Sequence, residues 1–392
     1  MKKHGWIVFA AIFVFGLFVF TAGELRAEGS GIEHRIHLSG LIEVGGVWQD
    51  IDYRSGVARP AEENESDLCL TTVELAAEAE LNEWVHVHAL LLYEDPTFGE
   101  ETHVEMEEAI LTIGNTKEYP VYVSAGKMFV PFGALLTHFP DDPLVHAPLT
   151  LLLGETLEKA ALVGVEYQGI SVSAYAFNGD QDEFGEDNQI ESWGCDANFS
   201  FDDEAGLDIL VGGSYISNIL DSDHLSDHLD EHWQALVDDG TVASTNDVGI
   251  KDYIDGAAAY LHVGFADFFV EAEYMTLLDE IDVRGTTAGA TFERHKVHHD
   301  PEVWNVEVGY NLDWGKNLEI VLKYAGSDEA GYLGFPEKRW GICLNQELFE
   351  EVIVSLGYLY DDYESDDVYT KDDINYVRDT KDLVFAQIAI EF

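Results

Sequence analysis

The sequence predicts an all-β protein, a transmembrane antiparallel β-barrel of about sixteen strands with short periplasmic turns and long acidic extracellular loops. Three observations lead to this fold class. The chain opens with an export signal, apolar and polar residues alternate through most of the remaining sequence, and the connections between the alternating runs are short and long in turn.

The export signal is read from the first 27 residues. Lys2 and Lys3 precede an apolar run from Trp6 to Phe20, and small residues come after it, before a candidate cleavage point after Ala27. This run is too short to span a bilayer comfortably, so residues 1–27 are expected to be a cleaved signal peptide. Residues 28–392 are then expected to form a single barrel domain.

Alternation is clearest between Trp304 and Leu312, where apolar residues occupy every second position and Asn305 and Glu307 lie between them. In a transmembrane strand one face meets lipid and the other meets the lumen, which produces this period of two. A soluble sandwich also alternates, so the alternation alone does not decide the fold.

The spacing of the runs separates the two folds, because sorting of short turns and long loops to opposite ends is typical of outer-membrane barrels. Connections such as 82–83 and 168–169 are short, whereas those at 130–159, 218–255 and 276–302 are long. The expected strands are 35–48, 67–81, 84–94, 103–113, 121–129, 160–167, 170–177, 193–201, 207–217, 256–265, 268–275, 303–312, 318–325, 339–346, 352–360 and 383–392.

The final run ends on an aromatic residue. Apolar side chains alternate from Val384 to Phe392, and a terminal Phe in this pattern resembles the assembly signal of outer-membrane barrels. With the export signal and the loop sorting, it predicts the bacterial outer membrane as the location and outer-membrane lipid as a partner.

The charge is strongly acidic, with 76 Asp and Glu residues against 20 Lys and Arg and a formal net charge of −56. This field repels nucleic acid, which is excluded as a partner, and it favours cations. Hydrophobic residues make up 46% of the chain and aromatic residues 12%, which argues against disorder.

The long connection at 130–159 is the expected constriction of the pore. A barrel this wide holds water, so its selectivity depends on what narrows it. Four prolines within the segment favour one defined path. In the alternative interpretation the loop only covers the mouth, with its carboxylates in solvent. The candidate pore residues are Lys127, His138, Asp141, Asp142, His146, Glu155 and Glu158.

Three motifs at and after this loop resemble the LbtU-like siderophore-porin family. They are the segment Lys127 to Gly133, the segment Leu153 to Gly164 and the segment Tyr175 to Asp180. The resemblance implies an outer-membrane porin linked to the uptake of iron-chelating siderophores. Many siderophores are anionic, however, and an acidic vestibule would repel them, so the transported solute stays open.

A histidine cluster lies in the longest loop. If the segment is helical, His224, His228 and His232 share one face, where imidazoles four residues apart can bind a divalent metal ion. The alternative is an amphipathic helix that caps the barrel without metal. No other cofactor is expected.

These features predict a porin-like channel for passive or facilitated uptake of small solutes, cation-preferring, with ferric siderophores as one solute class. We do not expect an enzyme. Two alternatives are an outer-membrane hydrolase on the same barrel and an adhesive barrel that binds divalent cations. The sequence contains no G-x-S-x-G motif to mark a nucleophile. A homotrimer is a further expectation, because barrels of this size often form one.

Overall fold

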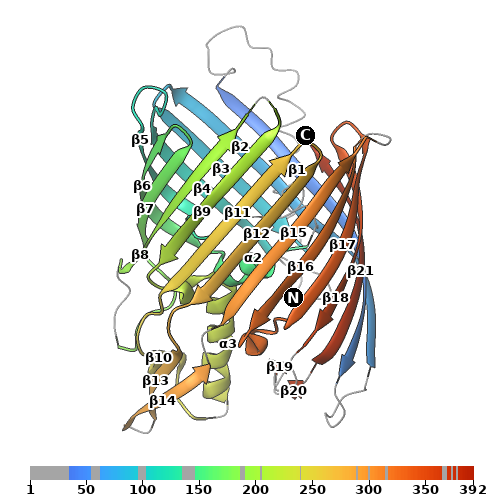
Figure 1. Ribbon diagram of the computed structural model, residues 1–392. Coiled ribbons are helices and arrows are strands. Elements are labelled where there is room, and N and C mark those ends of the chain that lie inside the picture. Colours follow the sequence, from blue (N-terminus) through green and yellow to red (C-terminus); the bar gives the residue numbers. More distant parts are fainter. Residues whose placement is uncertain are drawn as a thin grey trace, which may run out of the picture. The chain divides into compact units, whose positions relative to one another are not determined.

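The computed structural model describes residues 35–53, 62–95, 103–134, 146–185, 190–203, 205–238, 240–287, 290–298, 301–313, 317–363, 369–371, 374–376 and 378–392. Leu38–Phe392 forms one compact unit, a closed antiparallel barrel of sixteen strands (Figure 1). In ring order the strands are β1 (Ile36–Tyr53), β2 (Glu62–Asn82), β3 (Val85–Glu94), β4 (His103–Gly114), β5 (Val121–Phe129), β6 (Leu157–Tyr167), β7 (Ile170–Phe177), β8 (Ser192–Asp202), β9 (Leu207–Ile216), β11 (Gly256–Phe265), β12 (Phe268–Leu277), β15 (Glu302–Leu312), β16 (Leu318–Asp328), β17 (Lys338–Phe349), β18 (Val352–Asp362) and β21 (Arg378–Glu391).

The predicted fold class is confirmed, and each of the sixteen expected strands has its counterpart in the ring. Short turns join the strands at one end, and the long connections gather at the other (Figure 1). The turn between β6 and β7 shows how local sequence permits this. Gln168 and Gly169 both have positive φ, as a tight two-residue hairpin turn requires. The predicted signal peptide lies outside the described residues.

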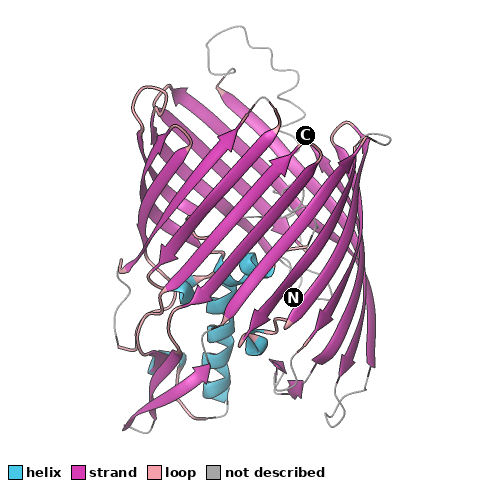
Figure 2. Ribbon diagram, viewed as in Figure 1, coloured by secondary structure: helices cyan, strands magenta, loops and turns pink. Residues whose placement is uncertain are grey.

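The long connections contain elements of their own. Two helices are α2 (Leu149–Gly154) and α3 (Asp223–Asp238), and a small separate sheet joins β10 (Val248–Ile250), β13 (Ile281–Thr287) and β14 (Ala290–His298). A short hairpin pairs β19 (Tyr369–Lys371) with β20 (Ile374–Tyr376). Figure 2 shows both helices among the strands and long connections. No helix among the described residues is long and apolar enough to cross a membrane.

The two faces of the wall differ as a barrel in lipid requires. On β15, Val308 is 41% exposed and points outward, whereas its neighbour Glu307 is 1% exposed and lies on the inner face. The same alternation exposes Val163, Ile342 and Val384 on other strands. Apolar side chains therefore face lipid, and the polar ones gather in the interior.

The barrel closes between its first and last strands. β1 pairs with β21 from Leu41 opposite Glu391 to Tyr53 opposite Arg378. Beyond the ladder, Phe392 N donates to Gly40 O at 3.0 Å and Gly40 N donates to Phe392 O at 2.8 Å. These bonds pair backbone groups at the end of the seam that would otherwise lack partners.

Five inward aromatic rings each lie over a glycine directly opposite on the next strand. At each glycine, a Cβ atom would come within 2.3 Å of the ring or its hydroxyl, so the ring occupies the space that a side chain would take. Such pairs fix the register of neighbouring strands through side-chain packing. The pairs are Tyr122–Gly164, Tyr175–Gly194, Tyr260–Gly212, Phe269–Gly309 and Phe385–Gly357.

The long connections share an apolar core with the barrel wall. Leu225 and Trp233 of α3 belong to the same buried cluster as Phe132 of the 130–159 loop and Ile281 of the small sheet. This shared core holds the separate loops together as one packed layer.

We expect Gly309→Ala to destabilise the barrel by about 1–3 kcal/mol, because overpacking displaces neighbouring groups. The new methyl group would lie 1.9 Å from Phe269 Cε1, so the ring would have to leave its position. Urea unfolding of the refolded protein in detergent micelles measures the loss. Gly46→Ala is the matched control, because its nearest neighbour would be Leu68 Cδ1 at 3.8 Å. Equal unfolding midpoints for the two variants would contradict this role of the ring.

Candidate channel interior

The 130–159 loop leaves β5 and reaches the far side of the barrel. Gly133 N donates to Ser214 Oγ of β9 at 2.7 Å, and Ala134 N donates to Glu273 Oε1 of β12 at 2.5 Å. In ring order, β9 and β12 are several strands away from β5. The outgoing arm of the loop therefore crosses the interior.

The returning arm is bound to the same region of the wall. Thr150 Oγ1 of α2 donates to Glu273 Oε2 at 2.6 Å, and His146 O accepts from Lys323 Nζ of β16 at 3.2 Å. α2 packs against β12, β15 and β16 before the chain returns to β6. The carboxylate of Glu273 thus holds both arms, one on each oxygen.

The predicted pore residues are distributed unevenly around this loop. His138, Asp141 and Asp142 lie outside the described residues. Lys127 is tied to β4, where its Nζ donates to Glu105 Oε2 at 2.7 Å and to Met106 O at 2.9 Å. Glu158 is buried on β6.

His146 and Glu155 lie near opposite ends of the returning arm and have different surroundings. Burial lowers the pKa of His146 well below its ordinary value, and the nearby Arg339, Lys323 and Lys381 lower it further. Burial raises the pKa of Glu155 to about 8, with Asp223, Glu107 and Glu94 adding to the shift. The returning arm therefore runs from a basic part of the interior to an acidic one.

The basic part of the wall was not predicted from the sequence. Lys and Arg are scarce in this chain, so the few that lie on strands could have indicated it. We call Lys323, Arg339, Arg378 and Lys381, on β16, β17 and β21, the basic wall. Lys323 Nζ pairs with Glu307 Oε1 at 3.0 Å, and Arg339 Nε pairs with Asp361 Oδ1 at 2.7 Å.

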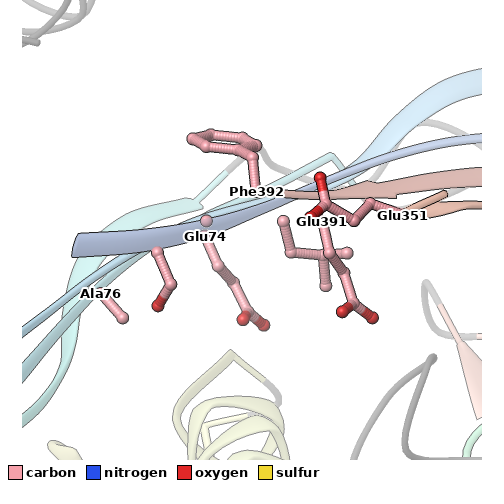
Figure 3. A pocket seen from close by; sticks show the side chains of 8 residues that line it. Glu74, Ala76, Glu351, Glu391 and Phe392 are labelled. Atoms are coloured by element: carbon pink, nitrogen blue, oxygen red, sulfur yellow. The ribbon is translucent and has the colours of Figure 1, made fainter. Parts of the chain in front are cut away.

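Carboxylates line the end of the barrel that carries the short turns. Two pockets, of about 370 and 430 Å³, meet at Glu351 and Glu391. In Figure 3 the carboxylates of Glu74 and Glu391 point to one side of the sheet and the ring of Phe392 to the other. Glu319 and Glu347 line the second pocket, so this end is acidic.

The histidine segment forms α3, as expected for the amphipathic helix. The ring of His224 stacks on Phe335 at 5.3 Å, and its Nε2 lies 3.4 Å from Leu333 O. Burial lowers the pKa of His228 to about 4, with His224 and His232 contributing. No group of three or more His, Cys, Asp or Glu residues in the described part of the chain is arranged to hold a metal ion. Metal binding at these histidines stays a prediction.

Removal of the shared anchor should free the loop. Glu273→Ala deletes the acceptor of two buried hydrogen bonds, and we expect loop docking to lose roughly 2 kcal/mol or more. Limited proteolysis within residues 130–159 measures this as faster cleavage. Glu118→Ala removes an exposed carboxylate from the turn after β4 and serves as the control. Equal cleavage rates in the two variants would exclude the anchoring role.

Glu155 should make stability depend on pH. Its pKa is raised from 4.5 to about 8, so between these values the folded protein keeps a proton that the unfolded chain has lost. Stability from this group therefore falls as pH rises, by up to about 1.4 kcal/mol per pH unit.

We expect Glu155→Gln to be more stable than the wild type at pH 8, with the difference shrinking toward pH 5. Urea midpoints measured across this range in detergent test it, with Glu118→Gln as the control. Parallel curves for wild type and Glu155→Gln would show that Glu155 titrates normally.

No family model matches this chain. Distant relatives are proteins named UPF0422. One from Coxiella burnetii is 24% identical over 284 residues, which is 71% of this chain and 56% of that protein. One from Legionella pneumophila (strain Philadelphia 1) is 22% identical over 306 residues, 76% of this chain and 54% of that protein. The chain spans about half the length of the curated relatives it matches.

Solved structures with a similar fold include OmpF and a porin. Salmonella typhi OmpF, solved with daunomycin, has a TM-score of 0.54 at 12% identity and covers 91% of this chain and 97% of its own. The anion-selective porin from Comamonas acidovorans has a TM-score of 0.54 at 10% identity. The match covers 91% of this chain and 99% of that porin. The chain therefore has the closed antiparallel barrel of the porins, and this fold indicates the bacterial outer membrane.

Proposed function

We propose that this protein is an outer-membrane channel for small hydrophilic solutes, narrowed by the 130–159 loop. The observation that carries the proposal is the path of this loop. Its described arms are bound to β9, β12 and β16 on the far side of a polar interior. A segment that crosses a barrel of this width reduces the open cross-section, so its neighbours set which solutes pass.

A preference for cations is part of the proposal. The carboxylates at the short-turn end, including Glu74, Glu351 and Glu391, line pockets of the interior. Asp223, which lies near Glu155 where the loop returns to β6, adds negative charge there. Rings and clusters of carboxylates raise the local concentration of cations in a pore.

Passage of ferric siderophores is a finer form of the same function, and its support is the sequence resemblance over the three motifs. The names of the distant relatives specify no solute. Block of the channel by a ferric siderophore is the direct test of this solute class. A trimeric assembly stays an expectation, which cross-linking in detergent would test.

Reconstitution in a planar bilayer tests the channel itself. We expect stepwise conductance from the refolded mature chain, and a reversal potential displaced toward the K⁺ equilibrium potential in a KCl gradient, because the acidic interior favours cations. Raising the salt concentration should weaken this displacement through screening. A barrel that inserts but carries no current would contradict the proposal and favour a closed or enzymatic barrel.

A further inference from the structure

We propose that the basic wall is a binding subsite for a small oxyanion group, a carboxylate or phosphate, carried by a permeating solute. This inference rests on the proposed channel function and narrows it. The solute would carry at least one such group into an interior that is acidic elsewhere.

The first argument is that positively charged residues, which are scarce in this chain, are concentrated on one part of the wall. The chain has 20 Lys and Arg residues, and four of them lie on neighbouring strands of one wall. Strand register places Arg339 and Lys381 on either side of Asp361, directly opposite it on β17 and β21. Lys323 lies two residues before Ala325, the partner of Arg339 on β16. All three therefore share the inner face.

Arg378 joins them through an irregularity in β21. Asp52 pairs with Thr380 and Tyr53 pairs with Arg378, so Asp379 is an extra residue at this point. A bulge of this kind redirects the following side chain. It puts Arg378 on the face of its partner Tyr53, and its guanidinium lies 5.6 Å from the centre of the Tyr363 ring.

The second argument is the local balance of charge. Glu307 and Asp361 are the acidic partners of Lys323 and Arg339, and Glu65 is near enough to Lys381 to interact with it. Glu307 bonds Lys323, while Arg339 Nε and Nη2 contact the two oxygens of Asp361 at 2.7 and 2.9 Å. Lys381 faces the same carboxylate across the ladder. The cluster therefore gathers four cations around these carboxylates in a chain of strongly negative charge.

The third argument is a buried donor. Arg339 is 5% exposed, and its Nη1 has no hydrogen-bond partner within the described part of the chain. A buried guanidinium N–H without an acceptor is costly, and an oxyanion supplies the acceptor and the charge that it lacks. Planar guanidinium groups bind carboxylate and phosphate in this way.

The position of the cluster gives it a role in selection. His146 O is bonded to Lys323, so the basic wall adjoins the returning arm of the loop that crosses the interior. The lowered pKa of His146, which Arg339, Lys323 and Lys381 favour, keeps its imidazole neutral at pH 7. A solute held at this wall would therefore lie at the narrowed part of the channel.

Citrate is the probe, measured in two ways. Added to the refolded barrel in a KCl bilayer, it should reduce single-channel conductance in a concentration-dependent manner. Calorimetric titration of the detergent-solubilised barrel should show binding at similar concentrations. We expect Lys381→Gln to raise the half-blocking concentration about fivefold or more, since loss of one charged contact is worth roughly 1 kcal/mol.

Two further variants complete the design. The double variant Arg339→Gln with Asp361→Asn removes the ion pair without leaving a buried charge, and it should also weaken binding. Lys117→Gln removes an exposed cation from the turn after β4 and should bind citrate as the wild type does.

Failure of this inference and failure of the proposed function are distinguishable. Normal KCl conductance with no citrate block and no binding heat would overturn the subsite and leave the channel standing. Absence of conductance would overturn the channel, and the calorimetric comparison of wild type with Lys381→Gln would still decide the subsite. Equal binding by wild type and Lys381→Gln would exclude the basic wall.

Discussion

The need to pair every backbone N–H and C=O group in hydrocarbon is the constraint on which the structure depends. A sheet meets it only by closing on itself, and here β1 closes on β21. Closure fixes which face of each strand meets lipid, so every strand alternates between exposed apolar and buried polar residues. It also creates an interior, and the crossing loop, the carboxylates and the basic wall all project into that interior from a rigid frame.

The sixteen strands were predictable because their signal is local. Alternation from Trp304 to Leu312 is imposed by lipid on one side and water on the other, and it needs no knowledge of the neighbouring strand. The secondary structure within the long connections was harder to predict. β10 pairs with β13, more than thirty residues later in the chain, and a three-residue strand such as Val248–Ile250 carries no periodic pattern that could indicate it.

The interior was predicted only in outline. The 130–159 loop was identified from its length and place, yet its anchors Ser214, Glu273 and Lys323 belong to strands more than eighty residues away. The basic wall was hidden for a related reason. Arg378 and Lys381 fell in a predicted loop, whereas they belong to β21 and face inward through register and a bulge at Asp379. Register is a property of two strands, and one strand's sequence does not specify it.

The shared anchor Glu273 has a consequence for how the loop can move. Because its two oxygens hold the outgoing arm at Ala134 and the returning arm at Thr150, neither arm can shift far while the carboxylate stays in place. Release of one arm leaves an oxygen of a buried carboxyl group without its donor, which is costly. The two arms of the loop and β12 are thus tied into one unit, and the loop keeps its path across the lumen through a single side chain.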